Sequence, residues 1–135
     1  MYNNFVQRKY VKFLLSYFSN FILKITIKDY EIEICTTAFN TFFFLTFLKK
    51  HTNCLFFMLS DIVVYDKPYA TQRFVVIYQL LSLSYNSRIR LVSLVNEFSG
   101  LCSVSSLFKC SNWLEREAFD MFGVYFFGHP NLRRI

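Results

Sequence analysis

LKITIKDYEIEIC (Leu23 to Cys35) is the stretch of sequence that decides the fold. Leucine or isoleucine occupies positions 23, 25 and 27 and then 32 and 34, with lysine, threonine or glutamate at the positions between them. A period of two predicts strands with one buried face. Lys28-Asp29-Tyr30 joins the two runs and predicts a hairpin. The opposed lysine and glutamate rows predict cross-strand ion pairs.

Helices are predicted on both sides of this hairpin. The segment Phe5 to Phe18 is typical of a short amphipathic helix, and Thr37 to Lys50 follows the hairpin as a second helix. Phenylalanines at positions 39, 42, 43 and 47 cover much of the second helix. We interpret them as core packing rather than as an aromatic binding site. His51 is expected at the helix C-terminus, where positive charge is favourable.

Three further strands are predicted downstream, over Cys54 to Tyr65, Arg73 to Ser84 and Ile89 to Val95. Turn-forming residues separate them at positions 66–68 and 85–87. Leu107 is expected in a short helical turn. The predicted fold class is α+β: a mixed or antiparallel sheet of about five strands with an N-terminal helix, one helix on the sheet and a capped helix near the C-terminus.

The whole chain, residues 1–135, is expected to form one domain, since its length suffices for a single core. We divide it into an N-terminal helix (1–21), a sheet with its helix at 37–50 (22–96), and a helical element with a docking tail (97–135). The longest run without charge, Ile34 to Leu48, is shorter than the roughly 20 residues of a membrane-spanning helix. The excess of apolar residues therefore suggests burial against partner proteins.

Composition limits the chemistry that the chain can perform. Its four cysteines, at positions 35, 54, 102 and 110, lack the spacing of zinc or iron–sulfur ligands, so we interpret them as reduced thiols. Neither a P-loop nor G-x-G-x-x-G occurs.

Abundant phenylalanine with scarce alanine and glycine suggests that the gene lies in an AT-rich organellar genome. The basic segment before Asp29 is interpreted as an ordinary helix rather than a cleaved presequence.

The C-terminal block NWLEREAFDMFGVYFFGHPNLRRI (Asn112 to Ile135) combines a helix with an arginine-ended tail. Asn112 and Glu115 have the spacing of a capping box, and Gly123 suits the left-handed residue after a helix, so Trp113 to Phe122 is predicted to be helical. One broad face of this helix is apolar. A narrow charged stripe is predicted opposite it, containing Arg116, Glu117 and Asp120.

Within that stripe, Arg116 and Asp120 have the spacing of an ion pair. Catalysis by the charged cluster is disfavoured, because neither a nucleophile nor a set of metal ligands accompanies it. Arg133 and Arg134 place adjacent guanidinium groups that suit carboxylates across an interface, although a solvated basic tail is the alternative. With no partner carboxylate in view, His129 is assigned to loop structure or interface hydrogen bonding rather than to proton transfer.

ERE-x-x-D-M-F-G followed by GHPNLRRI resembles the 30-kDa subunit family of respiratory complex I, the NADH:ubiquinone oxidoreductase. Other blocks resemble the same family, especially its mitochondrial branch. They are FLTFLKKHTNCLFFMLSDIVVYD (Phe44 to Asp66), RFVVIYQLLSLSYNSRIRL (Arg73 to Leu91), SLFKCSNW (Ser106 to Trp113) and the alternating segment Leu23 to Cys35. The resemblance covers roughly Ile22 to Ile135.

The resemblance implies a non-catalytic, cofactor-free subunit of the quinone module, in the peripheral arm on the matrix side of the mitochondrial inner membrane. There it would pack against the 49-kDa subunit and support electron transfer from NADH to ubiquinone by a proton-translocating enzyme. Iron–sulfur clusters, FMN and quinone are expected on neighbouring subunits or their interfaces. The interface residues that it implies are Glu115, Arg116, Glu117, Asp120, Gly123, His129, Pro130, Leu132, Arg133 and Arg134.

The family usually continues beyond the Arg-Arg-Ile at which this chain stops. We expect the remainder to be a separate polypeptide, to be replaced by another subunit, or to be lost. One alternative is the equivalent subunit of a plastid-type ferredoxin–plastoquinone complex or of a membrane-bound hydrogenase. A basic RNA-binding module is a more distant alternative, because the RNP-type pattern is missing.

Overall fold

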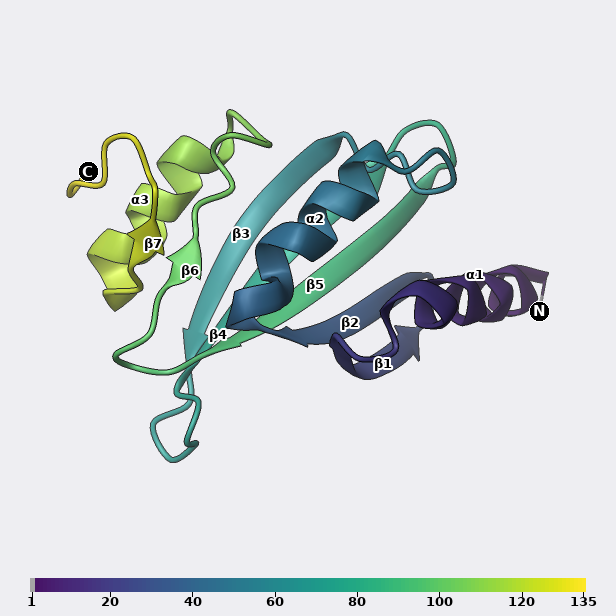
Figure 1. Ribbon diagram of the computed structural model, residues 1–135, viewed down its shortest axis with the longest axis horizontal. Helices are drawn as coiled ribbons and strands as arrows, with labels where there is room; N and C mark the ends of the chain where they lie inside the picture. Colours follow the sequence, from purple (N-terminus) through teal and green to yellow (C-terminus); the bar gives the residue numbers. More distant parts are fainter. Residues whose placement is uncertain (1) are drawn as a thin grey trace.

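The computed structural model describes residues 2–135, and Figure 1 shows a curved sheet with α2 lying across one face. Its elements, in chain order, are α1 (Tyr2–Phe18), β1 (Ile22–Lys28), β2 (Glu31–Thr37), the 3-10 turn η1 (Ala38–Asn40), α2 (Thr41–Lys50), β3 (Met58–Asp66), β4 (Phe74–Ser82), β5 (Ser87–Val95), β6 (Leu101–Cys102), α3 (Ser111–Phe122) and β7 (Phe126–Phe127).

The main sheet has five strands in the order β1-β2-β5-β4-β3. Strands β2 and β5 are parallel, whereas every other neighbouring pair in this sheet is antiparallel. Strands β6 and β7 form a separate short parallel pair. This mixed sheet with helices confirms the predicted α+β class.

The first hairpin has the turn that its sequence predicts. Lys28 faces Glu31, so that Asp29 and Tyr30 form the connection, and Asp29 adopts a φ of 48°. Aspartate tolerates this left-handed region better than most residues. Nζ of Lys28 lies 3.1 Å from a carboxylate oxygen of Glu33, which confirms one of the predicted cross-strand pairs.

Several element boundaries differ from the prediction, and two of them differ most. The helix expected from Thr37 begins as a helix only at Thr41, because Thr37 still belongs to β2 and the 3-10 turn η1 intervenes. The strand expected from Cys54 begins at Met58. The amides of Cys54 and Leu55 both donate to the carbonyl of His51 at 3.0 Å, so the chain turns there before it extends.

The core lies between the sheet and the helices. Alternate residues of the strands point into it, including the fully buried Ile34, Tyr78 and Leu91. Phe44 of α2 packs on this face. Because each sheet strand turns one set of alternate side chains inward, the period-two pattern sets which residues are buried.

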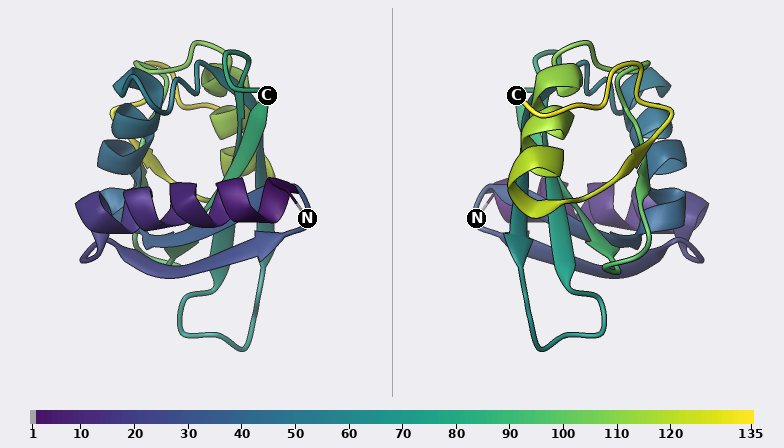
Figure 2. Two further views of the ribbon diagram at one scale, coloured as in Figure 1. Left: turned by 90° about the vertical axis from the view of Figure 1, so that its right-hand side faces the viewer. Right: turned by 90° about the vertical axis from the view of Figure 1, so that its left-hand side faces the viewer.

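Aromatic contacts join α1 to α2, and Figure 2 shows α1 beside the β1–β2 end of the sheet. The ring of Phe18 lies 4.9 Å from that of Phe44 and 4.6 Å from that of Phe47, measured between centroids. His51 follows α2 directly, and its amide donates to the carbonyl of Phe47 at 2.9 Å. The predicted place of His51 at the helix C-terminus is therefore confirmed.

Candidate functional site

Helix α3 begins differently from the prediction, so the capping box of Asn112 and Glu115 is wrong. The helix starts at Ser111 after Cys110, and no side chain caps it. The amides of Leu107 and Phe108 donate to the carbonyl of Val104, which forms a turn upstream of the helix. This turn leads directly into α3. Asn112 is the second residue of the helix and therefore cannot be its N-cap.

Glu115 instead reaches across to the segment that contains β6. Its buried carboxylate accepts hydrogen bonds from the hydroxyl of Ser103 at 2.6 Å and from the amide of Val104 at 2.7 Å. Burial raises the pKa of Glu115, although the hydrogen bonds from Ser103 and Val104 act to lower it. Glu115 thus ties α3 to a neighbouring segment.

His129 lies beside this carboxylate, although the sequence offered no partner for it. Its Nε2 is 3.8 Å from a carboxylate oxygen of Glu115 and 3.2 Å from the carbonyl oxygen of Asn112. Since a carbonyl only accepts, Nε2 carries a proton. The amide of Asn131 donates to Nδ1 at 3.1 Å, which leaves Nδ1 unprotonated. These contacts together select the neutral Nε2–H tautomer.

Arg116 contradicts the predicted charged stripe, because only 5% of its surface is exposed. Its guanidinium donates to the carbonyls of Arg133 at 3.4 Å and Arg134 at 3.2 Å, and lies 4.5 Å from the ring centre of Trp113. The predicted pairing of Arg116 with Asp120 is replaced by an ion pair between Asp120 and Arg134, with 3.4 Å between their charged atoms. Both charged residues therefore hold the C-terminal tail, residues 124–135, against α3.

The structure brings together most of the predicted interface residues. Glu115 and His129 form one cluster, while Arg116, Asp120, Arg133 and Arg134 form another through side-chain and backbone contacts. Leu132 is half-buried against the core, and Pro130 is exposed. Glu117 lies apart from both clusters, in a groove beside β3. Gly123 ends the helix with a φ of 75°, as predicted.

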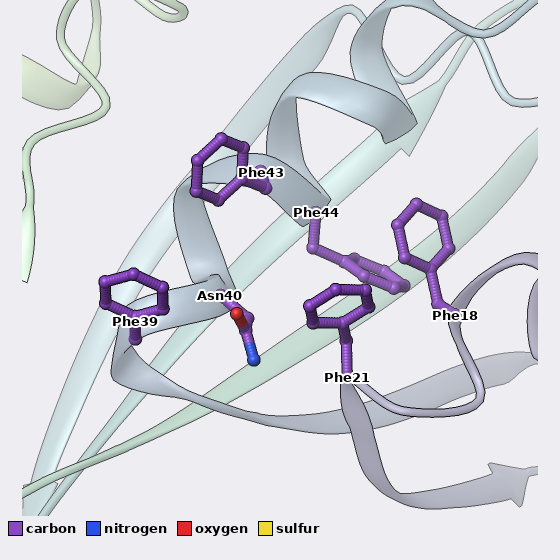
Figure 3. A pocket seen from close by; sticks show the side chains of 6 residues that line it. All are labelled: Phe18, Phe21, Phe39, Asn40, Phe43 and Phe44. Carbon is purple, nitrogen blue, oxygen red and sulfur yellow. The ribbon is translucent and has the colours of Figure 1, made fainter.

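The aromatic residues around the start of α2 are not all core residues, which corrects their predicted role. Phe39 is 80% exposed and Phe43 is 65% exposed. Figure 3 shows these two rings on one side of a pocket and Phe18, Phe21 and Phe44 on the other, with Asn40 between them. The pocket measures about 350 Å³ and has no charged residue in its lining. Helical spacing alone did not distinguish these exposed rings from buried ones.

The described residues, 2–135, contain no group of three or more histidine, cysteine, aspartate or glutamate side chains placed to hold a metal ion. Over the same residues, no helix has both the length and the apolar character needed to cross a membrane. The four cysteines are free thiols.

Comparison with known proteins identifies the family. Residues 32–135 match the family described as "Respiratory-chain NADH dehydrogenase, 30 Kd subunit". The chain is 43% identical over 122 residues to NADH-ubiquinone oxidoreductase subunit 9 of Reclinomonas americana, covering 90% of this chain and 60% of that protein. It is 41% identical over 127 residues to the probable mitochondrial 30.4 kDa subunit of Candida maltosa, covering 94% of this chain and 46% of that protein.

A solved structure shares the fold. A chain of the membrane-bound sulfane sulfur reductase, an archaeal respiratory membrane complex, superimposes with a TM-score of 0.78 at 19% identity, covering 91% of this chain and 71% of the other. The two curated relatives are longer, and this chain spans roughly half of their length, 60% and 46% respectively. The family match and these identities confirm the predicted resemblance: the chain belongs to the 30-kDa subunit family of the respiratory-chain NADH dehydrogenase, complex I.

Proposed function

We propose that the chain is a non-catalytic subunit of the quinone module of mitochondrial complex I. It would act on the matrix side of the inner membrane by docking to the 49-kDa subunit, and so support electron transfer from NADH to ubiquinone. The family membership supports a place in this multi-subunit complex. Relatives that are named mitochondrial support the compartment.

One observation carries the docking role: α3 holds the tail so that its arginines face outward. In the tail, Arg116 binds the backbone carbonyls of Arg133 and Arg134 and leaves their side chains unengaged by it. The side chain of Arg133 has no hydrogen-bond or ionic partner among the side chains of residues 6–135, and that of Arg134 is 86% exposed. A guanidinium fixed at its backbone loses less conformational freedom on binding a carboxylate, which favours association.

The exposed rings of Phe39 and Phe43 are a second contact surface in this proposal. A monomer rarely exposes a continuous apolar patch, and such a patch marks interaction sites. Phe39, Phe43 and the half-buried rings near them line a pocket without charge, which suits an apolar side chain of a neighbouring subunit.

The chain itself would carry no cofactor. Iron–sulfur clusters, FMN and quinone would reside on neighbouring subunits or their interfaces. Purified chain should then show neither visible absorbance nor bound iron after expression with iron supplied. Stoichiometric iron that survives gel filtration would contradict this part of the proposal.

The docking role is tested by pull-down from detergent-solubilised mitochondrial membranes. We expect the chain to recover the 49-kDa subunit and NADH dehydrogenase activity, and the double variant Arg133→Glu/Arg134→Glu to recover several-fold less. A matched control, Lys24→Glu/Lys50→Glu, reverses two exposed charges on β1 and α2. Circular dichroism establishes that each variant is folded. Equal recovery by the tail variant and the control would refute docking through the tail.

A further inference from the structure

A second pocket lies on a different part of the molecule, between α1, the β2–β5 pair and the segment after α2. It measures about 350 Å³ and shares no lining residue with α3 or the C-terminal tail. Its apolar lining consists of Val6, Tyr10, Ile32, Phe56 and Ile89. Pockets of this size with mostly apolar walls and a few polar groups are typical of small-molecule sites.

Polar side chains gather in the same lining. They are Gln7, Asn53, Tyr85, Ser87 and Arg88. Tyr85 is already engaged, since its hydroxyl donates to the carbonyl of Thr52 at 2.8 Å. The remaining groups include hydroxyl, amide and guanidinium donors, which are suited to a hydrogen-bonding head group.

Arg88 is the one charged residue of this lining. Its neighbour across the parallel strands is Glu31, yet Glu31 pairs with Arg90 at 2.6 Å instead. Among the side chains of residues 6–135, no hydrogen-bond or ionic partner contacts Arg88. Arg88 is exposed, belongs to the lining of an apolar pocket, and has a strand neighbour, Glu31, that is already engaged. A guanidinium in this position is electrostatically complementary to an anion.

The interior of the pocket is apolar and uncharged. The hydroxyl of Tyr10 donates to the sulfur of the buried Cys54 at 3.1 Å. Burial raises the pKa of Tyr10 and that of Cys54, so both stay neutral at physiological pH. The side-chain oxygen of Gln7 is buried without a hydrogen-bond partner. Rotating that amide by a half turn would present its N–H₂ group at the same place.

We propose that this pocket binds a single-chain amphiphile, with its apolar chain inside the cavity and its anionic head, a carboxylate or a phosphate, on Arg88. The apolar walls stabilise the chain by removing its surface from water. The guanidinium pairs with two oxygens of the head group, and the Gln7 amide and the hydroxyl of Ser87 supply further donors. This binding site is independent of the docking role proposed for α3 and the tail.

Isothermal titration of the full chain with decanoate, decyl phosphate and decanol tests the site. We expect saturable 1:1 binding of at least one of the two anions, and binding of decanol that is several-fold weaker, because decanol cannot form the charged pair with the guanidinium. The better of the two anions identifies the head group as carboxylate or phosphate. Equal affinity for all three ligands, or no saturation, would overturn the proposal.

Two variants locate the ligand. Arg88→Gln should weaken binding of the anion several-fold and leave decanol unchanged, while the matched control Lys50→Gln, which removes an exposed charge from α2, should change neither. Val6→Trp places a large side chain at an exposed position of the lining and should weaken anion and alcohol alike. Unchanged affinity in both Arg88→Gln and Val6→Trp would refute binding at this pocket.

Discussion

Nε2 of His129 lies 3.8 Å from a carboxylate oxygen of Glu115, and both side chains are completely buried. These two residues connect the parts of the C-terminal block. Glu115 binds the segment after β6, and His129 binds the start of α3 through the carbonyl of Asn112. The neutral Nε2–H tautomer satisfies the hydrogen bonds of the His129 ring to the Asn112 carbonyl and the Asn131 amide. The pair is thus a structural junction between three segments of the chain.

Removing the carboxylate should destabilise this junction. Glu115→Ala leaves the buried amide of Val104 and the hydroxyl of Ser103 without their acceptor, and each such loss costs about 1–3 kcal/mol. Glu115→Gln keeps one carbonyl oxygen for the Val104 amide and should lose less. Urea unfolding followed by circular dichroism measures both variants. Equal stability of Glu115→Ala and the unmodified chain would show that these hydrogen bonds contribute nothing.

The raised pKa of Glu115 also predicts a pH dependence. The carboxyl of Glu115 keeps its proton in the folded chain at pH values where the unfolded chain has lost it. The contribution of Glu115 to the free energy of unfolding is therefore fully present below the ordinary pKa of 4.5, and it is lost as pH rises through the raised pKa of the folded chain. Asp66 acts in the opposite direction, because the hydrogen bond from Arg73 lowers its pKa.

The difference in unfolding free energy between the unmodified chain and Glu115→Gln isolates the glutamate. As pH rises above about 4.5, we expect the unmodified chain to lose stability relative to Glu115→Gln. The difference should level off above the pKa of Glu115 in the folded chain. A flat difference across that range would show that burial does not perturb this carboxyl.

Arg116 should determine how firmly the C-terminal tail is held. Arg116→Lys keeps the charge, but a single ammonium replaces the fork that reaches two carbonyls, so the tail should detach more often. Trypsin should then cleave after Arg133 and Arg134 several-fold faster, as mass spectrometry would record. Lys109→Arg, which changes an exposed residue outside the helix, is the control. An unchanged cleavage rate in Arg116→Lys would contradict the tethering role.

Features of this structure that depend on local sequence pattern were predictable, whereas features that depend on contacts between distant segments were not. The strands were predictable, because a period of two directly records one buried face. The parallel pairing of β2 with β5 was not, since partner choice depends on the whole sheet. Arg116 was misplaced because its acceptors are backbone carbonyls, and residue identities do not reveal these. The pairing of Glu115 with His129 likewise depends on how the tail folds back.

The exposed aromatic residues near α2 should matter little to folding. Phe39→Ser/Phe43→Ser removes rings that are mostly in contact with water, so the free energy of unfolding should change by about 0.5 kcal/mol or less. Phe44→Ala, which empties a fully buried position one residue away, should cost about 3–5 kcal/mol. Denaturant titration compares the three chains. A large loss in the double serine variant would mean that these rings stabilise the fold rather than a contact with another subunit.

Gly100 should tolerate no side chain, because the carbonyl of Tyr125, directly before β7, and the ring of Phe127 lie against it. A Cβ at this position would lie 2.7 Å from the carbonyl oxygen of Tyr125 and 2.6 Å from the ring of Phe127. The same carbonyl accepts a hydrogen bond from the amide of Leu101 at 2.9 Å, so the strand cannot move away without weakening the β6–β7 pair. Gly100→Ala should therefore cost about 1–3 kcal/mol in urea unfolding, as overpacked sites do. The control is Phe98→Ala, which changes a nearby side chain that is almost fully exposed and adds no atom near Tyr125. If Gly100→Ala were as stable as that control, β7 would have to approach β6 less closely than the structure indicates.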